Sequence, residues 1–297
     1  LEYLNYDRKE DRKKIIAETW DREKEYLILD EIHKMKKLVG LFITGLLFLS
    51  SCGSVPLTGR QQVLLVSDQE VVAASLTQYN DYLKTAKLST NATQSAKVLR
   101  VGQKIAAATE AYLKANGLSA DLANYAWEFK LVNDKQVNAF CMPGGKIVVY
   151  EGLLPLTTTD DELAVVIGHE VAHAVAKHAN ERMSQQLVAQ YGSSILGQVL
   201  SGKSAAVQTV ASTVYGLGAE YGVTLPYSRK HEYEADYMGL VFMAMAGYKP
   251  DVAVTFWQKM SANGGSGAPE FMSTHPSDAN RIAEINRHLP QIKAMVK

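Results

Sequence analysis

The stretch from residue 159 to residue 173, TDDELAVVIGHEVAH, decides how this chain folds. Thr159 and Glu162 have the spacing of a capping box, and an apolar run free of glycine and proline follows, so a helix is predicted to begin here. His169 and His173 lie four residues apart and therefore project from one face of that helix. One metal ion can touch both imidazoles. The alternative is a buried helix whose two histidines are satisfied by hydrogen bonds.

The spacing favours zinc or a similar ion. Neutral imidazole nitrogens bind zinc at about 2.0–2.1 Å, and two of them leave positions for a third protein ligand and for water. Glu170 projects beside the pair, where it can take a proton from that water and pass it to a leaving amine. We therefore predict one Zn²⁺ per chain, with His169 and His173 as ligands and Glu170 as the catalytic base.

A later acidic segment, from Ser228 to Gly239, has the pattern of another amphipathic helix. Glu232 and Asp236 share a face of this helix, because they lie four residues apart. Glu232 could complete a site of two histidines and one glutamate, and Asp236 could accept the free N–H of a ligand imidazole. Glu234 is expected to point elsewhere. An ordinary solvated acidic face is the alternative.

The remaining pattern predicts an α+β, mainly helical fold. Helices are expected over 67–86 and 92–116, a strand over 125–132, and a hairpin of strands 137–142 and 146–150 around Pro143-Gly144-Gly145. An exposed edge strand beside a metal site can pair with an extended peptide through main-chain hydrogen bonds. The strand from Val137 to Met142 is our candidate, with Asn138, Ala139 and Phe140 as substrate-binding residues. An interior strand that binds nothing is the alternative.

The N-terminal region has the composition of a targeting segment. Met35-Lys36-Lys37 precedes a short apolar run, and Leu49-Ser50-Ser51-Cys52 resembles a lipobox. The run is shorter than the ~20 residues of a membrane span. We predict a non-native upstream extension over 1–34, a lipoprotein signal peptide over 35–51, a lipid-proximal linker over 52–66 and a zinc metallopeptidase domain over 67–297. A short buried core helix is the alternative to the signal peptide.

Composition bounds the function classes. Of the 297 residues, 47% are hydrophobic, and 31 basic side chains balance 31 acidic ones, which excludes a disordered or collagen-like chain. A formal net charge of zero provides no broad field for phosphate backbones, so no nucleic-acid partner is expected. If Cys52 is acylated, Cys141 is the one cysteine left, and we expect it to be a small buried hydrophobe.

His275 is a further candidate catalytic residue. Pro276 favours an extended backbone at His275, and the glycine-rich segment 263–269 precedes it. His275 could occupy the open zinc position and hold an enzyme latent, it could donate a hydrogen bond to an oxyanion, or it could only pack a turn. We predict the first role. His178 is expected behind the ligands or at the surface, and Arg281 at the surface.

Several motifs in order resemble one family. They are Asn138-Ala139-Phe140, Pro143-Gly144-Gly145-Lys146, Gly152-Leu153, residues 162–173, Glu232-x-x-x-Asp236 and His275-Pro276. Together they resemble HtpX-like and CAAX-prenyl-protease-like zinc metallopeptidases over roughly residues 55–290. The resemblance implies a gluzincin fold, a third zinc ligand at Glu232, and a role in membrane-associated protein quality control. Because glycines interrupt residues 188–221, we predict two helices covering the site there and a resemblance to the periplasmic lipoprotein branch.

These observations predict a membrane-tethered zinc endopeptidase. Its expected substrates are unfolded or misassembled periplasmic and outer-membrane proteins, and its expected place is the outer membrane, facing the periplasm, with a lipid at Cys52. The alternative is a chaperone or assembly factor for outer-membrane proteins in which hydrolysis is secondary. The two functions differ in whether Glu170 matters. No oligomeric state is predicted.

Overall fold

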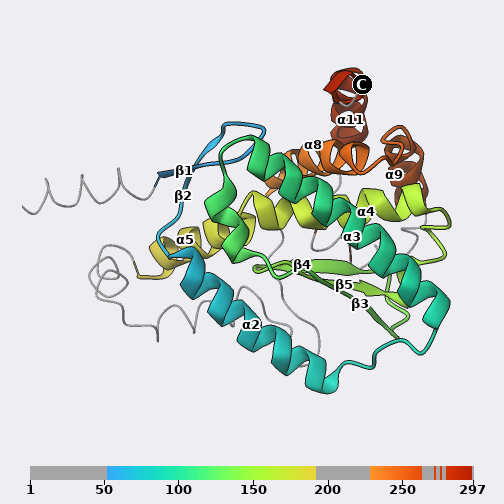
Figure 1. The fold of residues 1–297 in the computed structure, drawn as a ribbon, viewed down its shortest axis with the longest axis horizontal. Coiled ribbons are helices and arrows are strands. Elements are labelled where there is room, and N and C mark those ends of the chain that lie inside the picture. The colour runs from blue at the N-terminus through green and yellow to red at the C-terminus, as the bar shows by residue number, and fades with distance from the viewer. Residues whose placement is uncertain (1–51, 192–227, 263–270, 272–274, 276–278, 296–297) are drawn as a thin grey trace, which may run out of the picture. The chain divides into compact units, whose positions relative to one another are not determined.

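A small sheet and two crossing helices position the groups of interest in the computed structural model (Figure 1). The structure describes residues 52–191, 228–262, 271, 275 and 279–295. The predicted upstream extension and signal peptide, residues 192–221 of the predicted pair of helices, and the glycine-rich segment 263–269 lie outside these residues. Contacts divide the chain into two units, Leu1–Cys52 and Gly53–Lys297. Apart from the first residue of β1, the elements below belong to the second.

The predicted hairpin is present. Strand β4 (Ala139–Met142) pairs antiparallel with β5 (Lys146–Tyr150), and β5 also pairs in parallel with β3 (Glu128–Val132). The strand order β3-β5-β4 leaves β4 at an edge of the sheet. A separate two-stranded sheet joins β1 (Cys52–Ser54) to β2 (Gln61–Val63). The predicted edge strand is therefore at an edge.

The predicted capping box at Thr159 forms, and a second one forms at Ser67. Ser67 accepts from the Glu70 amide at the start of α2 (Asp68–Thr85), and Thr159 accepts from the Glu162 amide at the start of α4 (Asp160–Val175). The other elements are α3 (Ala92–Ala115), η1 (Ser119–Asn124), η2 (Glu151–Leu153), α5 (His178–Tyr191), α8 (Arg229–Met245), α9 (Val252–Ala262) and α11 (Ala279–Met295). The mainly helical α+β fold is confirmed.

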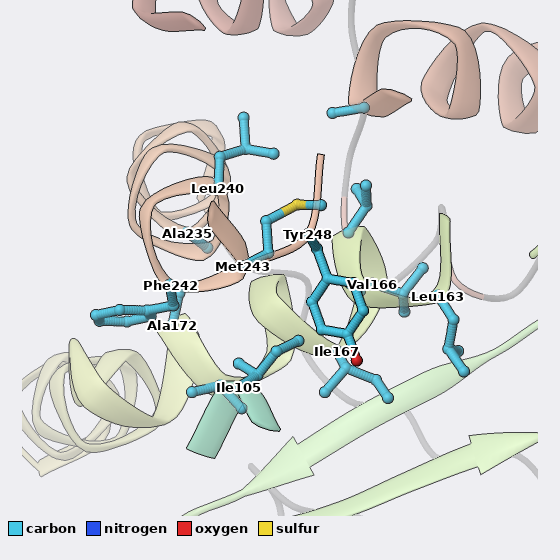
Figure 2. Close-up of a cluster of buried hydrophobic side chains, with 14 of the residues drawn as sticks. Ile105, Leu163, Val166, Ile167, Ala172, Ala235, Leu240, Phe242, Met243 and Tyr248 are labelled. Carbon is cyan, nitrogen blue, oxygen red and sulfur yellow. The ribbon is translucent and has the colours of Figure 1, made fainter. Parts of the chain in front are cut away.

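Alternating side chains place helices on both faces of the sheet. Ile147 and Val149 of β5 pack into a core with α3, α4, α8 and α9, part of which Figure 2 shows. Val148 and Tyr150, which point the other way, pack with residues of α2 and α5. Because successive side chains of a strand point to opposite faces of the sheet, β5 contributes to one core on each face. Helix α4 lies in the larger core, where 12 of its 16 residues are buried.

Two glycines set the closest helix contact. A Cβ placed on Gly239 of α8 would lie 2.7 Å from the carbonyl carbon of Gly168 of α4, and a Cβ on Gly168 would lie 2.7 Å from the Gly239 carbonyl oxygen. Only glycine allows the two backbones to approach this closely. Gly168 precedes His169 and Gly239 follows Asp236 by three residues, so this crossing brings the two predicted site segments together.

Both ends of the second unit differ from what local sequence suggests. Helix α11 continues through Pro290, although proline usually breaks a helix, because buried Leu289 and Ile292 hold both sides of the proline in the core. Residues 52–66, predicted as a linker, contain two strands and bury Val55 and Val66. No helix in the described part of the chain is long and apolar enough to cross a bilayer.

Candidate metal centre

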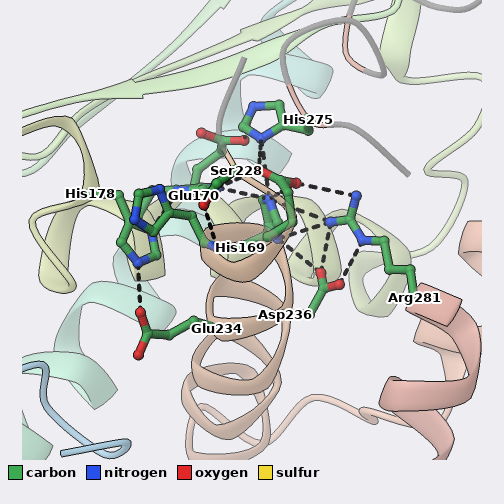
Figure 3. Close-up of polar contacts among 11 residues, drawn as sticks. His169, Glu170, His178, Ser228, Glu234, Asp236, His275 and Arg281 are labelled. Atoms are coloured by element: carbon green, nitrogen blue, oxygen red, sulfur yellow. Dashed lines mark hydrogen bonds and ion pairs between the residues drawn. The ribbon is translucent and has the colours of Figure 1, made fainter. Parts of the chain in front are cut away.

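Four potential ligands converge from three segments. His169 and His173 come from α4, Glu232 from α8, and His275 from the short segment that follows Phe271. One donor atom from each lies within 4.8 Å of every other, and all four side chains are buried. Figure 3 shows His169 and His275 meeting at the end of α8. The sequence-predicted ligand set is therefore brought to one place, with His275 added to it.

Asp236 lies behind His169. Its Oδ1 is 2.9 Å from Nδ1 of His169, and its two carboxylate oxygens also accept from Nε and Nη2 of Arg281 at 2.6 and 2.8 Å. An ionised carboxylate only accepts, so Nδ1 of His169 carries the hydrogen and its Nε2 presents a lone pair. The partner of His169 thus fixes both the tautomer and the orientation of the ring.

A second chain of contacts lies behind His173. Its Nδ1 is 2.8 Å from Nδ1 of His178, and Nε2 of His178 is 2.9 Å from the Glu234 carboxylate (Figure 3). Burial lowers the pKa of His178 to about 4 against the opposing effect of Glu234, so this imidazole is neutral. His178 then donates through Nε2 and accepts at Nδ1. His173 must donate through Nδ1, which leaves its Nε2 lone pair toward His169.

This donor set fits a cation. The Nε2 atoms of His169 and His173 are 3.0 Å apart, and two lone pairs at that distance require a shared proton or a metal ion between them. Burial lowers the pKa of His169, but the neighbouring carboxylates of Asp236 and Glu232 raise it to about 9 when no metal is bound, so a positive charge beside its Nε2, either a proton or a metal ion, is stabilised. Oε2 of Glu232 is buried and accepts no hydrogen bond. Two imidazoles and a carboxylate with this geometry are ligands that zinc prefers.

Glu170 lies beside the cluster without belonging to it. Its Oε1 is buried, accepts no hydrogen bond, and lies 3.4 Å from Nε2 of His275. Burial raises the pKa of Glu170, and the backbone N–H of Cys141 donates to its carboxyl group. A carboxylate with a raised pKa can accept and return a proton closer to neutral pH than an exposed one can.

The outer edge of β4 faces this carboxylate. The carbonyl of Asn138 accepts from the Tyr150 amide, so the alternate peptide groups of Ala139 and Cys141 point away from β5. The Asn138 side chain accepts from the Ala139 amide at 2.9 Å. Phe140 packs instead against Tyr82 and Tyr150 on the opposite side. Of the three predicted substrate-binding residues, Ala139 alone presents its backbone to the outer edge.

A pocket that opens to solvent adjoins His173. Its lining includes Val71 and Val72 of α2, Cys141 of β4, and Lys177 at the end of α4. Lys177 has a left-handed backbone conformation and pairs with both Asp68 and Asp121. The pocket therefore combines apolar walls with a neutralised cation at one side.

Sequence reasoning missed several residues of the centre. Arg281, expected at the surface, is fully buried, because Asp236 and Glu232 match its charge and the Trp257 ring stacks 3.5 Å from it. Glu234 contacts His178 because the helical turn from Glu232 carries it toward α5. The same-helix spacing His-x-x-Glu, present at His178–Glu181 and His231–Glu234, was the available sequence pattern.

Comparison with known proteins decides the family. The model of peptidase family M48 matches residues 93–289. This chain belongs to peptidase family M48. The M48 family uses zinc, and the cluster of His169, His173, Glu232 and His275 could hold such an ion, so the predictions of a zinc cofactor and of a metallopeptidase are confirmed.

Curated relatives of this M48 chain have related names. The mitochondrial metalloendopeptidase OMA1 of Arabidopsis thaliana is 43% identical over 58% of this chain and 34% of its own length. OMA1 of Saccharomyces cerevisiae is 30% identical over 89% of this chain and 77% of its own. The beta-barrel assembly-enhancing protease of Escherichia coli is 28% identical over 61% and 39%. The chain thus spans about a third to a half of the length of several relatives that it matches.

The predicted location is wrong. The relatives from Arabidopsis thaliana, Schizosaccharomyces pombe, Saccharomyces cerevisiae and Homo sapiens are mitochondrial, which points to a mitochondrial location and away from a bacterial outer membrane. The prediction relied on a short apolar run after two lysines and on four residues around Cys52. Such a run reports charge and length, which do not by themselves distinguish compartments. The side chain of Cys52 lies outside the described residues.

Proposed function

We propose that this M48 chain is an endopeptidase that hydrolyses unfolded or misassembled membrane-associated proteins. The observation that carries the proposal is the outer edge of β4, where the backbone N–H of Cys141 donates to Glu170 beside the metal cluster and the peptide group of Ala139 lies on the same edge. Backbone pairing with an extended substrate requires little sequence information and suits a polypeptide that has lost its fold. The name of the Escherichia coli relative, which refers to β-barrel assembly, supports the membrane-associated class.

The proposed chemistry divides among few groups. His169, His173 and Glu232 hold the metal, which when bound supplies a Lewis acid and activates water near neutral pH. Glu170 accepts the proton of the attacking water and returns it to the leaving amine. Asp236 keeps the His169 tautomer. The edge of β4 holds the substrate backbone extended beside Glu170, and the neighbouring pocket accepts a substrate side chain.

The test is Glu170→Gln, which keeps the size of the side chain and removes the base. We expect about one zinc per chain by metal analysis and a loss of cleavage of an unfolded model protein by about 10²-fold or more. Glu284→Gln, on the exposed face of α11, is the matched control and should cleave normally. His169→Ala should lose both zinc and activity.

Two outcomes would contradict the proposal. Wild-type cleavage by Glu170→Gln would remove Glu170 as the base. If Glu170→Gln lost cleavage but kept full ability to prevent aggregation of an unfolded membrane protein and to restore its assembly, the chaperone or assembly function would replace proteolysis as the main activity.

A further inference from the structure

A tight turn between β1 and β2 reaches the back of the metal centre. The amide of Val55 donates to the Arg60 carbonyl at 2.8 Å and that of Gly59 to the Val55 carbonyl at 2.9 Å. Gly59 has a φ of 67°, which glycine adopts without strain. The closed turn directs Thr58 and Arg60 toward helices α5 and α8. It precedes the part of the chain that the family model matches.

Helices α5 and α8 exchange two histidine–carboxylate contacts. His178 of α5 contacts Glu234 of α8 at 2.9 Å, and His231 of α8 contacts Glu181 of α5 at 3.0 Å. The rings of His178 and His231 stack with centroids 4.4 Å apart. Each histidine lies three residues before the glutamate of its own helix, so the two helices present the same pattern to each other.

Arg60 joins the two carboxylates. Its Nη1 and Nη2 donate to both oxygens of Glu181 at 2.9 and 2.7 Å, and its Nε donates to Glu234 at 2.7 Å. Thr58 donates its hydroxyl to the other oxygen of Glu234. Burial alone would raise the pKa of both carboxyls, but hydrogen bonds from His178, His231, Arg60 and Thr58 hold both at about 2. The planar guanidinium can serve two carboxylates at once, which an ammonium cannot do in this geometry.

We propose that Arg60 is a positioning residue of the metal centre, acting on the ligand His173 through Glu234 and His178. Arg60 holds Glu234, Glu234 orients His178, and Nδ1 of His178 accepts a hydrogen bond from Nδ1 of His173. That hydrogen bond fixes the tautomer in which His173 offers Nε2 to the metal. The turn at residues 55–60 thus contributes to the metal centre, because its Arg60 holds the contacts that orient the ligand His173.

The experiment measures zinc affinity, which does not depend on proteolysis, so its outcome is separate from that of the proposed function. Arg60→Gln should weaken zinc binding by about 10- to 100-fold in chelator competition, the usual effect of losing an outer partner of a ligand histidine. Arg100→Gln is the matched control, because Arg100 forms an exposed ion pair with Asp160, and it should bind zinc normally. Thr58→Val removes one hydrogen bond to Glu234 without removing a charge, and should give a smaller loss of the same sign.

A double-mutant cycle tests the route. If Arg60 acts through His178, adding Arg60→Gln to His178→Gln should weaken zinc binding little further. The absorption bands of the Co²⁺-substituted protein should shift in Arg60→Gln and in His178→Gln, and stay unchanged in Arg100→Gln. Full additivity of the two losses would overturn the proposed route. Wild-type zinc affinity in both folded variants, Thr58→Val and Arg60→Gln, would overturn the proposal. If Arg60→Gln does not fold, Glu234→Gln replaces it, and wild-type zinc affinity in Thr58→Val and Glu234→Gln would then overturn the proposal.

Discussion

His275 approaches the cluster from a segment separate from the two ligand helices. Its Nδ1 lies 3.2 Å from Glu232 Oε1 and 3.3 Å from His169 Nε2. Four residues earlier, the Phe271 amide donates to the carbonyl of Val137, two residues before β4. The alternation of peptide groups places that carbonyl on the outer edge, so the Phe271 amide takes up a position that a substrate backbone would need.

We predict that His275→Ala retains about one zinc per chain and cleaves unfolded substrate several-fold faster than the wild type. The reason is that His275 fills a ligand position that water and substrate need during catalysis. Steady-state cleavage with parallel metal analysis checks this. Slower cleavage with zinc intact would make His275 a donor to the transition state, and an unchanged rate would leave it a packing residue.

Glu162 combines a helix cap with an ion pair. It closes the capping box at Thr159 and accepts from Nζ of Lys259 of α9 at 2.5 Å. Burial opposes ionisation of Glu162, but hydrogen bonds from Lys259, Thr158 and the Thr159 backbone outweigh it and hold its pKa at about 2. A carboxyl with a depressed pKa contributes stability above its unfolded pKa and loses that contribution as the pH falls through the folded value.

We predict that Glu162→Gln lowers the free energy of unfolding by about 1–2 kcal/mol at pH 7, as lost caps and charged hydrogen bonds do. The difference from the wild type should narrow as the pH falls from about 4.5 toward 2, because the wild-type carboxyl becomes protonated there. Urea titrations at several pH values measure it. A difference that stayed constant over this range would show that the charge of Glu162 contributes nothing.

At the scale of elements, the crossing of α4 and α8 carries the ligands. We predict that Gly239→Ala destabilises the protein by about 1–3 kcal/mol, because the new methyl group overlaps the Gly168 backbone and forces the helices apart. The same displacement moves Glu232 from the histidines, so zinc affinity should fall as well. Met245→Ala, at an exposed position of the same helix, is the control for both measurements. If Gly239→Ala is destabilised but binds zinc with wild-type affinity, the close contact between α4 and α8 is not needed to position the metal ligands.

The positions of helices and strands could be predicted from local signals in the sequence. The contacts between residues that are distant in the sequence could not. The capping pairs at Ser67 and Thr159 and the hairpin at Gly144-Gly145 can each be recognised from three or four neighbouring residues. Arg281 gives no such signal, since its burial depends on Asp236, a residue on another helix. Arg60 was likewise invisible, because the two carboxylates that it joins are separated by about fifty residues and meet only when α5 packs on α8.

At the scale of the whole molecule, the metal connects segments that are distant in the chain. His169, His173, Glu232 and His275 meet in one cluster that could hold a metal ion, and an unfolded chain offers no such arrangement. Metal binding therefore adds to folding stability. The candidate ligands of α4 and α8 were predictable from the spacing of histidines and carboxylates, and His275 was predicted at the open position from Pro276 and the glycine-rich segment before it, whereas its contacts with Glu232 and His169 required the fold.

We predict that removing zinc with a chelator lowers the melting temperature. Saturation at about 100 times the dissociation constant stabilises a folded state by about 2.7 kcal/mol, which corresponds to roughly 5–10 °C for a domain of this size. Adding zinc back should restore the transition in a concentration-dependent way. His169→Ala should show no zinc-dependent shift. If neither the chelator nor added zinc changes the melting temperature of the wild type, metal binding does not contribute to its folding stability.

The contact between Phe271 and Val137 has a consequence for solubility. An unpaired strand edge is a template on which other chains aggregate, and proteins commonly cover such edges with a loop or a helix. Here the residue that caps the start of the β4 edge and the histidine that enters the metal cluster lie four positions apart on one segment. A substrate that pairs with this edge as proposed has to displace the Phe271 amide from Val137, and this also opens the edge to any other extended polypeptide, including another copy of the same chain. Under the proposed function, admission of a substrate and protection against self-association therefore oppose each other.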